Sequence, residues 1–453
     1  MKAQTRAIAG ATIAGASVTI ALCFMVAVLE GVDIQVMGVA APKLGAELQL
    51  ARDTLGRALS ASNIGLVLGA TLGGWLADRL GRKPVLIGSV ITFGAFTLGT
   101  MFAFSYESLF AARIGAGIGF GAALPNLMAM AAEVSPSDKR GSTGAMMFCG
   151  MPVGGGTVAL ISWLTPNQNW RVLFLIGGLA PLLVAPALML FLRETRATVA
   201  DRAATGSKSN SIWFGLIPLY GICYFLAGYA ALMPGAASLA GMAPWLAIPP
   251  TAIVAYVIVH REALFSQGRA FASGLLWLIF LPTLLILYLV LNWLPTLVAS
   301  KGFPADASQA SVWFNYTSVA GALLFGLLVD RFGVRWPLVI SYAGLIAALF
   351  MLSGADSRAW ILILSGVLGF FLLGANYALY GAAASYYPKA VRGRGSGAAI
   401  AWGRLGSVGG PLVGGYLLGG GANAGSVVYA MVPFAIVAGV SVLVLSFAAK
   451  PTE

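Results

Sequence analysis

The stretch Asp78-Arg79-Leu80-Gly81-Arg82-Lys83 recurs 252 positions later as Asp330-Arg331-Phe332-Gly333-Val334-Arg335. A second pair of segments keeps the same offset, because Pro136, Arg140 and Gly141 correspond to Pro388, Arg392 and Gly393. Two landmarks at one constant offset indicate an internal duplication. The duplicated segments are short and charged, and long apolar runs separate them.

The composition places this duplication in a membrane. Of the 453 residues, 59% are hydrophobic and 9% are charged, whereas soluble domains carry about 25% charged residues. A net charge of +12 would suggest nucleic acid as the partner of a soluble protein. Here the basic residues sit in short loops, where they set membrane orientation. We therefore expect the chain to lie in a lipid bilayer and to have no nucleic-acid partner. Duplicated membrane bundles are typical of secondary transporters.

The sequence indicates no cofactor and no metal site. The three cysteines lie inside apolar runs without metal or disulfide spacing, and His260 is the single histidine. No nucleophile–base pair stands out, so an enzyme is not expected. A membrane sensor is a further class, but no signalling domain supports it.

The lengths of the apolar runs predict the helices, since about 20 apolar residues span the hydrocarbon core. We expect an all-α membrane protein with two six-helix halves, residues 1–192 and 263–453, joined by residues 193–262. The first six helices are predicted near 15–41, 58–77, 84–104, 107–132, 142–164 and 171–192. The second six are predicted near 271–299, 311–329, 336–353, 359–386, 395–419 and 425–448.

Within the linker, residues 211–259 form an apolar region that contains no Asp, Glu, Lys or Arg. The basic loops stay on one side of the membrane only if this region crosses it an even number of times. We predict two inserted spans, with a re-entrant or interfacial hairpin as the alternative. Both chain termini are then expected in the cytoplasm.

The repeat provides an internal control, because polar residues present in both halves are expected to support the shared scaffold. Glycines 81 and 333 permit the tight turn between two helices. The aspartate beside each turn can accept hydrogen bonds from a helix N-terminus or from arginine. We expect a cytoplasmic gate that also sets topology. It comprises Gly74, Asp78, Arg79, Gly81, Arg82, Lys83, Arg140, Asp330, Arg331, Gly333, Arg335 and Arg392.

Charges present in one half alone need another explanation. Glu30 and Asp33 lie three residues apart in the first helix, and their repeat equivalents are Pro282 and Leu285. Such a pair shares one helix face, and acids at membrane depth are expected to face a cavity or a cation. Two neighbouring carboxyl groups can bind and release a proton. The alternative is a pair at the outer mouth that only solvates the helix end.

Three further charges, Arg113, Glu133 and Arg404, also have uncharged equivalents. An arginine inside the membrane needs a partner, and Glu30 or Asp33 is available to Arg113. Arg404 is expected to hold a substrate carboxylate through two hydrogen bonds, or to form a structural ion pair. Glu133 is expected either at the inner gate or as a solvated helix end. We assign all five charges to proton or substrate coupling.

Amides and phenols at mid-membrane form a second candidate group. Such groups can donate to a solute, and their rings can stack on an aromatic one. Hydrogen bonding between helices is the alternative for each. The candidate substrate-binding residues are Asn126, Asn315, Tyr316, Asn376 and Tyr380.

These residues resemble the major facilitator superfamily, through the duplicated loop, the Arg113 helix and the glycine-rich segment 149–156. Within it, the chain is similar to the aromatic acid:proton symporters, whose first helix carries an acid-Gly-x-Asp motif, here Glu30-Gly31-Val32-Asp33. The form with Glu first and Gln35 after it resembles the transporters for 3-(3-hydroxyphenyl)propionate.

The resemblance covers residues 10–195 and 263–450. It implies a monomer in the bacterial inner membrane that takes up an aromatic carboxylic acid together with a proton, by alternating access. Region 211–259 departs from this family, and an added helix pair also occurs in some drug:proton antiporters. A proton-antiport exporter of aromatic or drug-like compounds is therefore the alternative.

Overall fold

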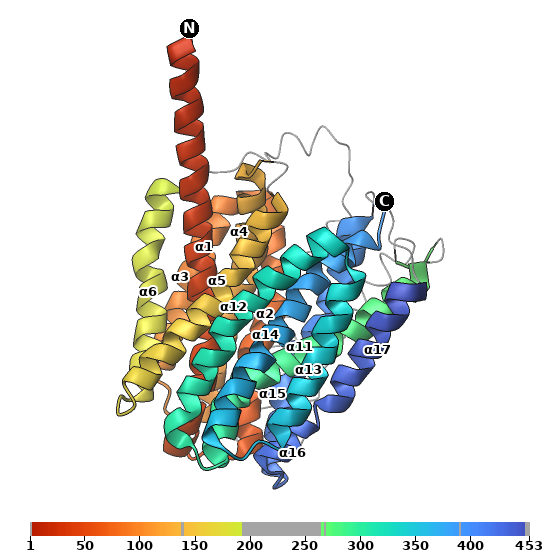
Figure 1. The fold of residues 1–453 in the computed structure, drawn as a ribbon. Helices are drawn as coiled ribbons and strands as arrows, with labels where there is room; N and C mark the ends of the chain where they lie inside the picture. Colours follow the sequence, from red (N-terminus) through yellow and green to blue (C-terminus); the bar gives the residue numbers. More distant parts are fainter. Residues whose placement is uncertain (1, 137–139, 193–263, 267–268, 389–390, 449–453) are drawn as a thin grey trace.

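A computed structural model of the chain describes residues 2–136, 140–192, 264–266, 269–388 and 391–448. These residues are almost entirely helical (Figure 1). The first half contains α1 (Lys2–Glu47), α2 (Arg52–Leu80), α3 (Arg82–Thr100), α4 (Tyr106–Val134), α5 (Arg140–Leu164) and α6 (Trp170–Phe191). The second contains α11 (Arg269–Ser300), η2 (Pro304–Asp306), α12 (Ala307–Phe332), α13 (Arg335–Ser353), α14 (Arg358–Ser385), α15 (Arg392–Gly419), α16 (Ala424–Tyr429) and α17 (Val432–Ala448).

The predicted helices are present, with two differences. Eleven segments of the described chain are long and apolar enough to cross a membrane, and α15 is outside this set because its glycines and Arg404 dilute its hydropathy. The last predicted helix is divided into α16 and α17. The two hydrophobic segments predicted in 211–259 lie outside the described residues.

Local chemistry sets several helix boundaries. The side chain of Asn169 accepts a hydrogen bond from the Arg171 N–H at the start of α6, a common way to satisfy a free donor there. Gly81 (φ 94°) and Gly333 (φ 73°) separate α2 from α3 and α12 from α13, and positive φ favours glycine. We call the end of the bundle with these two turns the loop end, and the opposite end the far end.

The two halves repeat their internal packing. In the first half α1 packs on α5, α2 on α4 and α3 on α6, and in the second α11 packs on α15, α12 on α14 and α13 on α17. A Cβ added at Gly69 would lie 2.0 Å from the Ile118 carbonyl, and one at the equivalent Gly321 would lie 2.1 Å from the carbonyl of the equivalent Phe370. Small residues permit such close approach of helices. Residues that lie 252 positions apart therefore make equivalent packing contacts in the two halves.

Contacts between the halves run between α1 and α11, α2 and α15, and α5 and α12. They are closest toward the far end. A Cβ at Gly38 would lie 2.2 Å from the Leu291 carbonyl, and one at Gly56 would lie 2.8 Å from the Pro411 carbonyl. The halves are thus held together at the far end by backbone-level contact.

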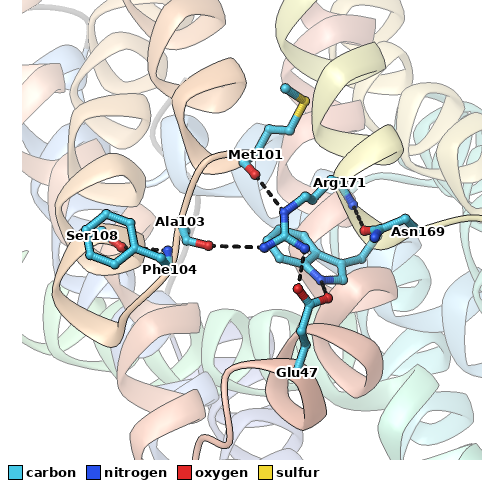
Figure 2. Close-up of polar contacts among 8 residues, drawn as sticks. Glu47, Met101, Ala103, Phe104, Ser108, Asn169 and Arg171 are labelled. Atoms are coloured by element: carbon cyan, nitrogen blue, oxygen red, sulfur yellow. Dashed lines mark hydrogen bonds and ion pairs between the residues drawn. The ribbon is translucent and has the colours of Figure 1, made fainter.

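Charged groups also fix the far end within the first half (Figure 2). Arg171 at the start of α6 forms an ion pair with Glu47 at the end of α1. Its Nε donates to the Met101 carbonyl over 3.0 Å, and the Trp170 indole donates to Glu47 over 2.6 Å. These bonds tie α1 and α6 to the connection between α3 and α4.

Candidate functional site

A cavity lies between the halves, and spaces between the helices of a bundle are a common place for small-molecule sites. Helices α1, α4 and α5 line it on one side, and α11, α12, α14 and α15 on the other. Most of the lining is apolar or aromatic. The polar lining residues are Glu30, Gln35, Tyr288, Asn315, Asn376, Tyr377, Tyr380 and Arg404.

Glu30 projects into this cavity from the middle of α1. The residue is 0% exposed, and neither carboxyl oxygen has a hydrogen-bond donor within the described part of the chain. An unpaired carboxylate in apolar surroundings is costly. The carboxyl group is therefore a candidate binding point for a proton or a cationic partner.

Arg404 faces the same cavity from α15. Its Nη1 donates to the hydroxyl of Tyr288 over 3.1 Å, and among the described residues it forms no ion pair within 4.0 Å. The structural ion pair that the sequence left open for Arg404 is thus not formed in this part of the chain. The guanidinium keeps donors for a bound anion.

Asp33, three residues after Glu30, lies in a different environment. Arg113 on α4 donates to its two oxygens over 3.0 and 2.5 Å, and Thr97 on α3 donates a short bond to Oδ1. Arg113 also donates from Nε to Ser62 over 2.9 Å. Both charged side chains are at most 1% exposed. This ion pair joins α1, α2, α3 and α4 inside the first half, and it does not line the cavity.

The structure therefore distinguishes two acids that the sequence treated together. Glu30 faces a cavity, and Asp33 faces a cation. Of the two partners considered for Arg113, the structure selects Asp33. The alternative of a solvated pair at the outer mouth is wrong, because Glu30 and Asp33 are both fully buried.

Glu133 lies away from the cavity, at the loop end, where it forms an ion pair with Arg82 across α3 and α4. Nearby, Arg79 stacks over the Trp75 ring at 4.0 Å and Lys83 donates to the Met189 carbonyl over 2.9 Å. These contacts place Glu133 with the predicted gate residues and not with the other four coupling candidates.

The loop end of the second half has different contacts. Arg335 lies over the Phe447 ring at 4.7 Å, Arg331 lies 5.4 Å from the Phe332 ring, and the Nε of Arg392 donates to the Tyr387 carbonyl over 3.3 Å. Asp78 and Asp330 lie in the last turns of α2 and α12, Gly74 has open space beside it, and Arg140 begins α5.

Two of the five predicted substrate-binding residues lie outside the cavity. Asn126 donates to the carbonyls of Ala122 (2.8 Å) and Gly73 (3.5 Å), so its amide joins α4 to α2. Tyr316 is 39% exposed and packs beside Gly156 of α5. Neither lines the cavity. Asn126 forms a hydrogen bond between helices, which was the alternative role considered from the sequence. Asn315, Asn376 and Tyr380 are lining residues.

Sequence reasoning did not assign Gln35, Tyr288 or Phe148 to the cavity. Tyr288 could have been found by the criterion applied to the charges, since its repeat equivalent is Val36. Phe148 carried no such signal, because its equivalent, Ile400, is also apolar. The Phe148 ring packs against Tyr377 and Tyr380 at centroid distances of 5.4 and 5.3 Å.

Two repeated six-helix halves around a central cavity are typical of secondary transporters. The chain belongs to the major facilitator superfamily, whose profile matches residues 23–320 and 304–453. Comparison with solved structures agrees on the fold. The crystal structure of a D-xylose-proton symporter aligns with a TM-score of 0.69 at 16% identity, over 96% of this chain and 98% of that one.

Curated relatives resemble the chain over nearly its whole length. The 3-(3-hydroxy-phenyl)propionate transporter of Escherichia coli K12 is 34% identical over 439 residues, which is 94% of this chain and 93% of that protein. The 4-hydroxybenzoate transporter PcaK of Pseudomonas putida is 32% identical over 93% of this chain and 91% of its own length. These relatives are membrane transporters and not enzymes.

Proposed function

We propose that this protein takes up an aromatic carboxylic acid, such as 3-(3-hydroxyphenyl)propionate, together with a proton by alternating access. The observation that carries the proposal is the pairing of Arg404 and Glu30 in one cavity without a salt bridge between them. An anionic substrate needs a cation whose donors are not already used, and a coupled proton needs a carboxyl group without a cationic partner. The relatives named for phenolic acids support the same substrate class.

The cavity offers a group for each part of such a substrate. Arg404 and the Tyr288 hydroxyl hold the carboxylate, and charge-assisted bonds of this kind are strong. The rings of Phe148, Tyr377 and Tyr380 pack against the aromatic ring. The buried Oδ1 of Asn376 has no donor in the described structure, so it can accept from a ring hydroxyl.

Glu30 carries the proton in this proposal. When protonated, it adds no negative charge beside the incoming carboxylate, so the anion can approach Arg404. When it is ionised, two negative groups compete for one guanidinium, and the substrate is released. The Asp33–Arg113 pair has its charges already satisfied, and we assign it to holding the first half rigid.

We also propose that the loop end faces the cytoplasm of a bacterial inner membrane, with both termini on that side and the chain acting as a monomer. The basic residues of the loops support this orientation. The duplicated loops act as the cytoplasmic gate, and the Arg82–Glu133 pair belongs to that gate.

Uptake into proteoliposomes tests the proposal. Labelled 3-(3-hydroxyphenyl)propionate and a benzoate are supplied outside, with and without an inward proton gradient. We expect accumulation of one acid that needs the gradient and is lost in Arg404→Gln. Proton efflux coupled to drug movement, without accumulation of either acid, would contradict it and support the exporter.

A further inference from the structure

Prolines interrupt several membrane helices of this chain. A proline has no N–H, so the carbonyl four residues before it lacks its helical hydrogen-bond donor. Such a carbonyl must find a side chain or water when it is buried. The partners of these carbonyls show which contacts the helices leave open.

Two of the carbonyls accept a hydrogen bond from the opposite half on the far-end side of the cavity. Pro411 in α15 frees the Ser407 carbonyl, which accepts from the Asn63 amide of α2 over 2.9 Å. Pro295 in α11 frees the Leu291 carbonyl, which accepts from the Gln35 amide of α1 over 3.2 Å.

A third freed carbonyl bonds across the halves on the loop-end side. Pro152 in α5 frees the Phe148 carbonyl, and the hydroxyl of Tyr377 on α14 donates to it over 3.0 Å. Phe148 and Tyr377 both lie toward the loop ends of their helices, and both line the cavity. The cavity thus lies between one such bond on its loop-end side and two on its far-end side.

Three of the eight prolines inside described helices thus free a carbonyl that accepts a hydrogen bond from the opposite half. Among the described residues, one further hydrogen bond runs from a side chain of one half to a carbonyl of the other. Ser60 donates to the Val408 carbonyl over 2.9 Å, one helical turn from Asn63. Pro186 in α6 is a useful contrast, because it is exposed on the outside of the bundle. Its freed carbonyl, at Leu182, belongs to a helix that packs mainly against α1 and α3 of its own half.

We propose that Pro411, Pro295 and Pro152 are positioning residues whose freed carbonyls act as latches between the halves. This inference rests on alternating access as proposed above. A carbonyl that accepts no hydrogen bond within its own helix is free to accept one from a donor in the opposite half. When the halves part, water in the opened cavity can replace the lost donor, so no buried group is left unsatisfied. The helix itself keeps its remaining bonds.

The proposal predicts opposite effects on the two sides of the cavity. Pro411→Ala restores an N–H that bonds Ser407 within the helix and competes with Asn63. Asn63→Ala removes the other partner of the same bond, so both variants should favour opening at the far end. Tyr377→Phe should instead favour opening at the loop end. Loss of one hydrogen bond should change each open-to-closed ratio by about fivefold.

Distances between spin labels on the purified full chain, without substrate, test this. In a background without the three cysteines, one pair is placed at Asn167 and Asp356 at the far end. The other is placed at Leu80 and Phe332, which are exposed repeat equivalents at the loop end. We expect longer far-end distances in Pro411→Ala and in Asn63→Ala, and no larger shift in the double variant, because both changes remove one bond.

Pro186→Ala is the control and should leave both distance distributions unchanged. The proposal is overturned if Pro186→Ala shifts the far end as much as Pro411→Ala does. It is also overturned if the two far-end changes add fully, or if Tyr377→Phe opens the far end. Failure to take up an aromatic acid would remove the proposed function alone, since these distances are measured without a substrate.

Discussion

Glu30 and Asp33 lie one helical turn apart on α1, and their surroundings differ completely. Asp33 accepts hydrogen bonds from Arg113 and Thr97 inside the first half. Glu30 faces the central cavity with both oxygens unpartnered in the described structure. The oxygens of Asp33 thus already accept hydrogen bonds, whereas the oxygens of Glu30 are available to a ligand.

This comparison separates two uses of charge inside a membrane protein. A buried ion pair with all its bonds made holds helices in one arrangement, although its net stabilisation is small because both charges lose water. A buried charge without a partner lowers stability and is retained for function. The predictions below test each side of this difference, from the largest expected effect to the smallest.

Removing one partner of the finished pair should have the largest effect. Arg113→Leu leaves Asp33 buried and unpaired, and we expect a loss of about 3–5 kcal/mol in the free energy of unfolding. Thermal unfolding of the purified protein in detergent measures it. The double variant Asp33→Leu with Arg113→Leu should recover most of that loss. Near-normal stability of Arg113→Leu alone would show that the pair does not hold the first half.

Changing the cavity arginine should affect binding and leave stability almost unchanged. Arg404→Gln removes the charge that holds the carboxylate, so substrate affinity should fall by about 2–4 kcal/mol, roughly 30- to 1000-fold. Equilibrium binding to the purified protein measures this fall. Arg404→Lys should recover it only partly, since lysine lacks the planar fork. Unchanged affinity in Arg404→Gln would place the carboxylate elsewhere.

A smaller effect is expected at Tyr288, which supports Arg404 through one hydrogen bond. Tyr288→Phe should weaken substrate binding about tenfold, the usual contribution of one bond to a charged group. Tyr342→Phe is the matched control, because its hydroxyl bonds Thr283 over 2.5 Å in the second half and does not line the cavity. Equal losses of affinity in both variants would contradict a specific role for Tyr288.

Much of the fold could be predicted from the sequence, because the constant offset and the lengths of the apolar runs are local properties. The charges present in only one half could also be found from the sequence, because Glu30, Asp33, Arg113 and Arg404 have uncharged repeat equivalents. Their partners were not visible. Residues three apart on a helix differ by about 60° in direction, and only the packing of α1 against its neighbours decides which one meets Arg113.

The roles of uncharged side chains were harder to predict. Asn126 and Asn315 are both amides at mid-membrane, yet Asn126 joins α2 to α4 while Asn315 lines the cavity and donates to Gln35 over 3.0 Å. Phe148 looks like any other apolar residue in sequence. Its position beside Tyr377 follows from Pro152 and from the approach of α14, which are properties of the assembled halves.

The smallest effect on stability, and the most direct test of the account, is expected from Glu30→Gln. The change keeps the shape of the side chain and removes its ability to bind and release a proton, so unfolding should shift by less than about 1 kcal/mol. In proteoliposomes, Glu30→Gln should still exchange labelled for unlabelled aromatic acid across the membrane. It should no longer accumulate the acid when an inward proton gradient is imposed. Gradient-driven accumulation at the wild-type level in Glu30→Gln would show that the proton is carried by another group.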